Sequence, residues 1–467
     1  MPLSSPFEFS PVKLVYGGDA LGFQAGRTVL APRVLPGERA EVEEVRRQKG
    51  VVHARPLRIL EPSRERIEPL CGYFGRCGGC QYQHLPHSAQ IAAKTEILRE
   101  TLRRLGKVTW NEPIPAHFGP AWNYRNQAQL KIGKPSEGPS ALGFFEAESN
   151  RLIPIDTCPI LSPRLNALLA VLHSEPWIGA LANGREVELL ADDRDAKVML
   201  ALTGNWDAQE AETLAHKCLV ELAGVSTVAV MHDVGLRVFG EPHLTYEVGG
   251  FAYRLSPTAF FQSARFLLSD LVAAVVAADV AADVAPGFSP ARADLKVGAT
   301  SLPADLKVGS TSLGEESGGV AIDLYAGVGL FTLPLARRFQ QVIAVEAHPQ
   351  AAADLAANAR TVPGNRIRAV AGTAFDFLRR YAQVNPYLVV MDPPRAGVDA
   401  ATLKLLVDVR PKRLLYVSCS PPTLARDLGF LLKHGYHLDG LDLFDCFPQT
   451  YHIESLARLS PIGRERA

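Results

Sequence analysis

Two side chains near the carboxyl end of the 467-residue chain have the chemistry of a nucleophile and a base. Cys419 lies in YVSCSPPTLARDL, where a strand-like run meets a sharp turn and a helix begins. A thiol at such a strand end can face a ligand crevice, and nearby Arg426 could favour its reactive thiolate form. Glu454 follows in DCFPQTYHIESLARL, on a short β-like run. The simpler alternatives are a buried thiol and an ordinary strand-end carboxylate.

A glycine loop earlier in the chain predicts a cofactor site. AIDLYAGVGLFTLPLA sets Gly327 and Gly329 between a strand and a helix, where glycine permits a sharp turn and close backbone approach. The dinucleotide fingerprint needs glycine or alanine three residues later, and this chain has Thr332. Glu346 ends the next strand, placed to bind two ribose hydroxyls, and Asp392 ends a later one. The pattern favours an adenosine cofactor without a pyrophosphate, S-adenosylmethionine (SAM) more than NAD.

A cysteine group predicts metal binding. Three of the seven cysteines, Cys71, Cys77 and Cys80, crowd into ten residues, and Cys158 is the candidate fourth ligand. Four thiolates suit Zn²⁺ and an iron–sulfur cluster equally, so spacing alone leaves both open. Uncomplexed core thiols are the alternative. The N-terminus carries no export signal, so the crowding favours a metal over disulfides.

The elements that would position these groups predict three domains. Residues 1–66 have short β-like runs separated by Gly and Pro, with many basic side chains, as in a small β-barrel of the OB-like kind. Residues 67–255 mix strand-like and helical patterns and are expected to form a mixed α+β domain that holds the cysteines. Residues 256–467 alternate β-branched runs with helices, which predicts a doubly wound, Rossmann-like α/β sheet.

One segment of the C-terminal domain departs from this pattern. ADLKVGATSL at 293–302 recurs as ADLKVGSTSL at 304–313. Few of these residues could build a core, so residues 286–319 are expected to be a disordered surface insertion. A stacked functional repeat would need more copies.

Composition predicts a soluble, cytoplasmic protein. Hydrophobic residues make up 47% and charged residues 21%, which excludes a disordered or fibrous chain. The longest apolar candidate, 267–284, is interrupted by three aspartates, so no membrane helix is expected. Lys and Arg total 49 and balance 49 Asp and Glu, but a local basic patch can still attract nucleic acid.

Taken together, these residues resemble the RNA uracil-5 methyltransferases that use SAM, the TrmA/RlmD group. The resemblance covers nearly the whole chain and implies a C-terminal SAM methyltransferase domain. The N-terminal segment resembles the TRAM barrel, an RNA-binding module, and CGYFGRCGGC with Cys158 resembles the [4Fe–4S] site of the rRNA branch. The motifs that carry the resemblance are FFQ at 260–262, DLYAGVG at 323–329, DPPR at 392–395, SCSPPTLARD at 418–427 and FPQTYHIE at 447–454.

The resemblance also implies residue roles. Cys419 matches the nucleophile and Glu454 the general base. The chain departs from the family at Ser420 and Leu330, where Asn is common, and in the repeat insertion. The cofactor contacts implied are Gln262, Tyr325, Glu346 and Asp392, with Gly327 of the glycine loop, and the implied cluster ligands are Cys71, Cys77, Cys80 and Cys158.

The implied reaction is covalent catalysis on a flipped base. Thiolate attack at C6 of uracil would make C5 nucleophilic, C5 would take the methyl group of SAM, and a base would then remove the C5 proton. The target must leave its stack, because C5 and C6 are inaccessible inside folded RNA. The TRAM segment would supply sequence-tolerant contacts to the RNA backbone.

Three functions compete on these grounds. The TRAM segment and the cluster favour 23S rRNA as the substrate of a monomeric enzyme, but some tRNA-specific relatives carry both, so a uridine of the tRNA T-loop is the alternative. A non-catalytic RNA-binding iron–sulfur protein is the third. The intact Cys419 and Glu454 argue against it, because a protein without the reaction has no chemical reason to keep both.

Overall fold

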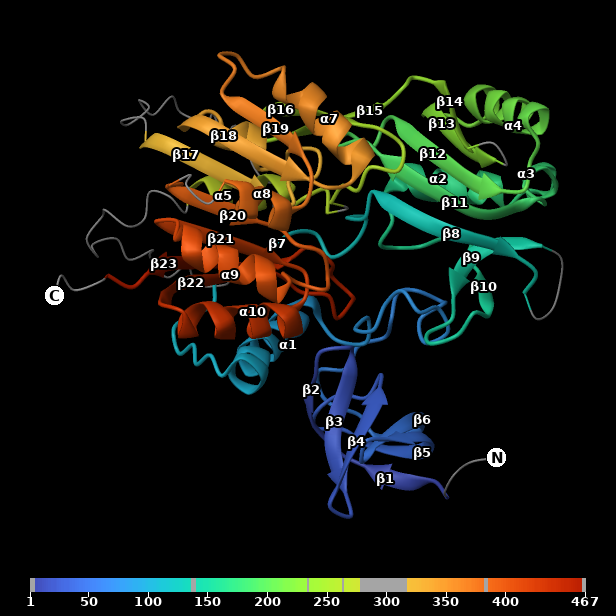
Figure 1. The fold of residues 1–467 in the computed structure, drawn as a ribbon. Coiled ribbons are helices and arrows are strands. Elements are labelled where there is room, and N and C mark those ends of the chain that lie inside the picture. Colours follow the sequence, from blue (N-terminus) through green and yellow to red (C-terminus); the bar gives the residue numbers. More distant parts are fainter. Residues whose placement is uncertain are drawn as a thin grey trace, which may run out of the picture.

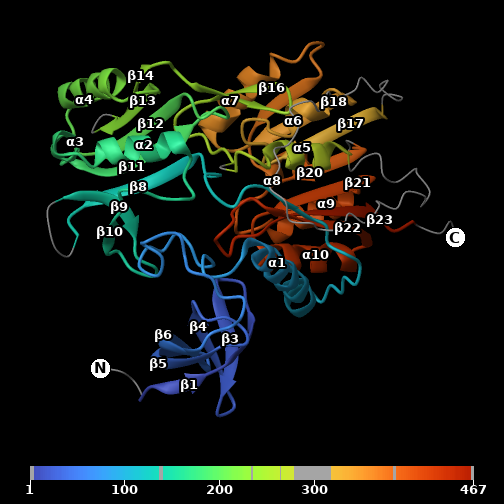
Figure 2. The same ribbon diagram turned by 180° about the vertical axis from the view of Figure 1, so that it is seen from behind.

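The computed structural model describes residues 5–135, 140–232, 235–262, 264–277, 317–381 and 385–463. Three main sheets, of six, seven and eight strands, form three parts of the molecule (Figures 1 and 2). Residues 286–316 of the predicted insertion lie outside the described residues, so its disorder stays a prediction. Its last residues, 317–319, belong to a strand of the largest sheet.

The N-terminal part is an all-β unit of six strands in the order β1-β5-β6-β4-β3-β2. Its pairs are antiparallel except β4 with β6. Along β5, buried Ala40 and Val42 alternate with more exposed residues, which is the period expected of a strand with one face on a core. The predicted short strands thus form one sheet, whereas the domain bounds 1–66 and the assignment as a TRAM barrel stay predictions. The strands are β1 (Phe7–Phe9), β2 (Pro11–Leu14), β3 (Asp19–Gln24), β4 (Arg27–Pro32), β5 (Arg39–Gln48) and β6 (Val51–Glu61).

The segment after the cysteine motif packs against the C-terminal part of the molecule. Helix α1 (His87–Thr101) continues as a π-helical turn, η1 (Leu102–Gly106). This turn lies against helix α10 (Pro421–Lys433), where a Cβ on Gly106 would stand 2.2 Å from the carbonyl oxygen of Ala425. Strand β7 (Ala116–Phe118) then pairs with β22 of the large sheet. Sequence patterns had grouped these elements with the central domain.

The central sheet confirms the mixed α+β prediction. Its seven strands run in the order β10-β9-β8-β11-β12-β13-β14, and helix α4 connects parallel strands β12 and β13. Its core contains Leu169 of α2, Leu200 of β12 and Val228 of β13. The elements are β8 (Gln127–Gly133), β9 (Ala141–Phe145), β10 (Leu152–Pro154), α2 (Pro163–Leu172), α3 (Glu175–Ala180), β11 (Gly184–Ala191), β12 (Val198–Gly204), α4 (Ala208–Glu221), β13 (Val225–His232) and β14 (Gly235–Gly240).

A hairpin joins the central part to the C-terminal sheet. It is formed by β15 (Leu244–Val248) and β16 (Phe251–Leu255), and its buried side chains share a core with the C-terminal strands. Arg254 donates from Nε to Asp354 at 3.0 Å, which fixes the hairpin to helix α7. Helix α5 (Leu268–Ala277) follows. Among the described residues, no helix is both long and apolar enough to cross a membrane.

The C-terminal part confirms the predicted α/β sheet. Five parallel strands, β17 to β21, are extended by antiparallel β23 and then by β22, which pairs antiparallel with β23, in the order β19-β18-β17-β20-β21-β23-β22-β7. Every residue of β20 is buried, as expected for a sheet covered on both faces. The elements are β17 (Ser317–Leu324), α6 (Thr332–Leu335), β18 (Phe339–Glu346), α7 (Pro349–Ala359), β19 (Ile367–Ala371), α8 (Ala374–Arg380), β20 (Leu388–Met391), α9 (Ala400–Val409), β21 (Arg413–Ser418), α10, β22 (Tyr436–Asp445) and β23 (Glu454–Pro461).

Candidate active site

The strand order creates a crevice where the predicted site residues meet. From β17 the chain winds outward to β18 and β19 on one side, and then to β20 and β21 on the other. Ligands of open α/β sheets bind at such a switch point, outside the carboxyl ends of the strands. Tyr325, Asp392 and Cys419 each follow the last residue of a parallel strand, and Glu346 ends another. Glu454 begins antiparallel β23 and therefore reaches the same edge.

Cys419 is a partly accessible thiol among ionisable groups. Burial, and then the neighbouring Glu454 and Asp392 carboxyl groups, raise its pKa to about 11, while Arg395 acts in the opposite direction. The expected thiolate partner, Arg426, is engaged elsewhere, since its Nε donates to Asp427 at 2.7 Å. The prediction for Arg426 was therefore wrong: the cation that favours the Cys419 thiolate is Arg395.

Glu454 is a buried residue, 1% exposed. Neither of its carboxyl oxygens accepts a hydrogen bond from any residue in the described part of the chain. Burial, and then repulsion from Asp392, raises its pKa well above the usual range, while Arg395 opposes the shift. A carboxylate with a raised pKa is a stronger base. The structure thus places the predicted base beside the predicted nucleophile.

Asp392 and Gln262 come together from distant parts of the chain. Gln262 Nε2 donates to Asp392 Oδ2 at 3.5 Å. Burial raises the pKa of Asp392 to about 7, and this hydrogen bond counteracts part of the shift. The two predicted cofactor contacts therefore share one location at the end of β20.

The glycine loop and Glu346 form one hydrogen-bonded unit. Glu346 accepts the N–H of Gly327 at 2.8 Å through Oε2 and that of His348 at 2.6 Å through Oε1. Each carboxylate oxygen keeps a free lone pair, so the group can still accept ribose hydroxyls. Tyr325 has a left-handed φ of 61°, a conformation that costs a non-glycine residue about 1–3 kcal/mol and gathers at ligand sites.

Thr332 explains why the loop does without the third glycine. Its Oγ1 donates to Asp323 Oδ2 at 2.5 Å, and both side chains are fully buried. Burial raises the pKa of Asp323 to about 7, while the Thr332 bond opposes that shift. The threonine thus fixes the start of α6 to the end of β17, below the loop.

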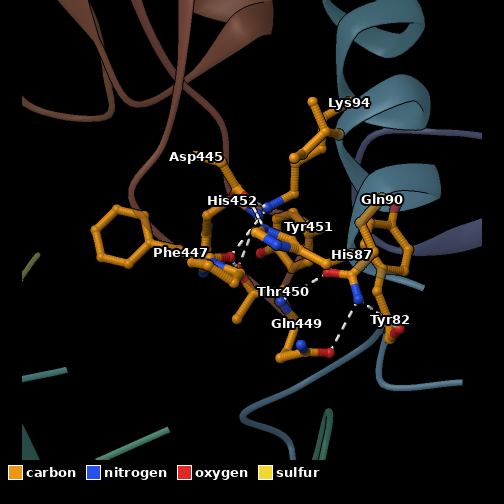
Figure 3. Close-up of polar contacts among 12 residues, drawn as sticks. Tyr82, His87, Gln90, Lys94, Asp445, Phe447, Gln449, Thr450, Tyr451 and His452 are labelled. Atoms are coloured by element: carbon orange, nitrogen blue, oxygen red, sulfur yellow. Dashed lines mark hydrogen bonds and ion pairs between the residues drawn. The ribbon is translucent and has the colours of Figure 1, made fainter. Parts of the chain in front are cut away.

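A buried ion pair holds the segment that leads to Glu454. Lys94 of α1 donates from Nζ to Asp445 Oδ1 at 2.6 Å and to the Phe447 carbonyl at 3.0 Å, and its side chain is fully buried (Figure 3). His87 Nε2 lies 2.7 Å from the other Asp445 oxygen. Although burial acts to raise it, the pKa of Asp445 is lowered by Lys94 and His87. An amphipathic helix pattern gives no reason to expect a buried lysine here.

A pair of buried glutamines continues this connection. Gln90 Nε2 donates to Gln449 Oε1 at 2.9 Å, and the N–H of Gln449 donates to Gln90 Oε1 at 2.8 Å (Figure 3). The backbone N–H groups of Gln81 and Tyr82 both donate to the Gln449 carbonyl at 2.9 Å. The segment after the cysteine motif is therefore bonded directly to the segment before Glu454.

The four predicted cluster cysteines line a single cavity of about 430 Å³. Cys158 is far in sequence from Cys71, Cys77 and Cys80, yet the four thiols influence one another's ionisation. Burial raises the pKa of Cys80 to about 12 and that of Cys158 to about 11, with the other thiols adding to both shifts. Among the described residues, no three His, Cys, Asp or Glu side chains are close enough to hold one metal ion. The predicted cluster is therefore neither confirmed nor excluded.

The N-terminal sheet carries fewer free cations than its sequence suggests. Arg27, Lys49 and Arg64 are exposed and form no ion pair with a described residue. They remain available for phosphates. Most other cations of this part are paired with acids: Arg39 with Glu8 and Glu61, Arg46 with Glu148, Arg47 with Glu44, Arg55 with Glu43, Arg58 with Glu41, and Arg66 with Glu38.

The sequence and the fold of this chain are similar to those of known proteins. The family described as tRNA (Uracil-5-)-methyltransferase matches residues 309–461. The 23S rRNA (uracil(1939)-C(5))-methyltransferase RlmD of Alkalilimnicola ehrlichii is 32% identical over 97% of this chain and 96% of that protein. An uncharacterized RNA methyltransferase of Thermosynechococcus vestitus is 31% identical over 96% of each chain. The Pyrococcus abyssi tRNA (uracil-54, C5)-methyltransferase, solved with S-adenosyl-L-homocysteine, has the same fold, with a TM-score of 0.68 at 21% identity over 97% of this chain and 100% of that one.

The switch-point sheet and its glycine loop, with these similarities, define a SAM-dependent RNA methyltransferase. More particularly, the chain belongs to the RNA uracil-5 methyltransferase family. The sequence-level resemblance is thereby confirmed.

Proposed function

We propose that this protein transfers a methyl group from SAM to C5 of a uridine in structured RNA, with Cys419 as nucleophile and Glu454 as base. The observation that carries the proposal is the buried Glu454 carboxyl group, without a hydrogen-bond partner among the described residues, beside the accessible thiol. Buried polar groups are nearly always hydrogen-bonded, so an unpaired carboxyl group at a crevice is available to a ligand.

The proposed steps conserve atoms and electrons. The Cys419 thiolate forms a bond to C6, and the C5=C6 π electrons move to C5 and the O4 enolate. SAM, when bound, would supply the electrophilic methyl group that C5 takes, and S-adenosylhomocysteine would leave with the electron pair of the broken S–CH3 bond. Glu454 then removes the C5 proton, the C5=C6 bond re-forms, and the thiolate is expelled. Arg395 stabilises both anionic side chains, because it lowers the pKa of each.

The residues around the glycine loop fit SAM. The acceptors of Glu346 suit ribose hydroxyls, and a Cβ on Gly327 would meet no atom within 4 Å, so the loop borders open space. Gln262 and Asp392 would hold the amino acid end of the cofactor, with Tyr325 beside them. We assign all five residues to the cofactor side of the site.

The four cysteines line one cavity of about 430 Å³, and four thiolates suit either zinc or an iron–sulfur cluster. We propose that Cys71, Cys77, Cys80 and Cys158 bind a [4Fe–4S] cluster, as in the rRNA branch of the family. Protein purified without oxygen should contain about four irons per chain; one zinc per chain instead would refute this assignment.

The proposed substrate is 23S rRNA, because RlmD relatives match almost the full length of the chain. The N-terminal sheet would bind the RNA backbone through its free cations. Purified protein should methylate a 23S rRNA fragment, and the Cys419→Ala variant should not. Methylation of tRNA alone would reassign the substrate to the T-loop, and no incorporation into either RNA would contradict the proposed function.

A further inference from the structure

The N-terminal part of the molecule reaches the active site through the loop between β2 and β3. Tyr16 of this loop meets Tyr451 edge to face, with ring centroids 5.4 Å apart and an interplanar angle of 88°. Tyr451 lies three residues before Glu454. Gly18 permits the approach, because a Cβ there would stand 2.7 Å from Gln81 Cγ and 3.5 Å from Tyr451, at a φ of +97° that favours glycine.

Tyr16 is also close to the nucleophile. The pKa of Tyr16 is affected by the Ser420 side chain and by Cys419 and Arg395, which places these groups near its ring. Burial, and then Tyr451, raises the pKa of Tyr16, so the phenol is neutral at physiological pH. Two domains far apart in sequence thus contribute to one rim around Cys419.

The tyrosine pair continues into a row of aromatic rings. His452 lies 4.4 Å from Tyr451 and 5.9 Å from Phe447, measured between ring centroids. Burial lowers the pKa of His452 to about 4, so this ring is also uncharged at neutral pH. All four rings are partly exposed. Uncharged, partly exposed rings are the surfaces on which proteins stack unpaired RNA bases.

Joining the two domains does not by itself explain the exposure of this pair. Tyr82, a few residues along the same interface, is fully buried, as a ring that only packs would be (Figure 3). Tyr16 and Tyr451 are instead only partly buried. A base that leaves its own stack needs such a replacement surface.

We propose that Tyr16 and Tyr451 form a stacking platform for the RNA base adjacent to the flipped uridine, with Tyr16 as a substrate-positioning residue supplied by the N-terminal domain. The inference rests on the proposed function and extends it from the catalytic pair to the neighbouring nucleotide. RNA then docks on the N-terminal domain and presents the uridine to Cys419 in a single binding step.

Steady-state kinetics of full-length variants test the platform. Base stacking is worth about 1–3 kcal/mol, which is about 5- to 150-fold in affinity. Tyr16→Ala and Tyr451→Ala should therefore raise KM for RNA by that factor, with the SAM dissociation constant unchanged. Tyr16→Phe should remain near wild type, because the ring is kept. Phe239→Ala, at a partly exposed ring on the far edge strand β14, is the matched control and should change nothing (Figure 1).

A spectroscopic measurement separates stacking from a merely structural role. RNA with 2-aminopurine beside the target uridine should lose fluorescence on binding the Cys419→Ala protein, and Tyr16→Ala in that background should restore it. Unchanged quenching and KM in Tyr16→Ala would overturn the platform while leaving the proposed function intact. A Tyr16→Phe defect as large as that of Tyr16→Ala would also overturn it, since the hydroxyl would then be the active element. Failure of the wild-type protein to bind or methylate any RNA would instead be a failure of the proposed function.

Discussion

Replacing Glu454 with glutamine isolates the last step of the proposed reaction. The residue is 1% exposed, its carboxyl group has no hydrogen-bond partner in the described part of the chain, and glutamine has nearly the same shape. The thiolate of Cys419 can still attack, and C5 can still accept the methyl group. Only removal of the C5 proton is lost. A methylated protein–RNA adduct should therefore accumulate.

The size of the effect follows from the burial of this carboxyl group. General bases contribute about 10²–10⁴-fold to a rate, or about 3–5 kcal/mol of barrier. Because Glu454 is shielded from bulk water, solvent cannot easily take over its role, and we expect the upper half of that range. Release of RNA should then slow by about 10³–10⁴-fold, while a single turnover of methyl incorporation stays near the wild-type level.

Denaturing electrophoresis with labelled RNA and labelled SAM measures both quantities. The Glu454→Gln protein should give a shifted band that carries both labels. The Cys419→Ala/Glu454→Gln double variant is the control and should give none, because it lacks the attacking sulfur. Multiple turnover at near the wild-type rate without an adduct would refute the reasoning and assign the base to another group.

Four further predictions test other parts of the molecule. With a Cys419 pKa of about 11, kcat/KM should rise about tenfold per pH unit between pH 6 and 9, because only the thiolate reacts. Arg395→Gln removes a cation that lowers the pKa of the Cys419 thiol. It should lower kcat/KM at pH 7 by about 3- to 10-fold and shift the pH profile of kcat/KM to higher pH. An unchanged pH profile would exclude Arg395 from the site. Glu346→Ala should weaken SAM binding by about 10- to 150-fold, from about 1.5–3 kcal/mol for a charged hydrogen bond, and calorimetry should show unaltered RNA affinity. Lys94→Met should lower the unfolding free energy measured in urea by about 3–5 kcal/mol, because Asp445 is left buried without its main cation. The double variant Lys94→Met/Asp445→Leu should recover most of this loss. Equal losses in the single and double variants would contradict an ionic role for the pair.

Local patterns in the sequence were enough to predict the C-terminal sheet and most of its site. Parallel strands end at a common edge, so side chains that follow successive strands must meet there. Cys419, Asp392 and Glu346 could be placed at this edge on that ground, whereas Tyr325 was predicted only from the family resemblance. Glu454 lies on a strand, β23, as its motif predicted.

The sequence did not reveal which side chains from other elements complete the site. Arg426 and Arg395 are equally basic in sequence, and only packing shows that Arg426 is occupied by Asp427. Lys94 fits a solvated helix face, yet the contact of α1 with the segment around Asp445 buries it. Tyr16 is remote from Glu454 in the chain, and no periodicity links them.

The sequence by itself determined the order of elements, the chemistry at each strand end and the presence of four candidate cluster thiols. Strand and helix periodicities and motif spacings are properties of short segments, so they can be read locally. The tertiary structure alone decided that β7 joins the large sheet, that Cys158 shares a cavity with Cys71, Cys77 and Cys80, and that an N-terminal tyrosine borders the nucleophile. These contacts join residues far apart in the chain. They depend on how entire faces of helices and sheets pack together. The free energy of that packing is distributed over many side chains and is not encoded by any single motif.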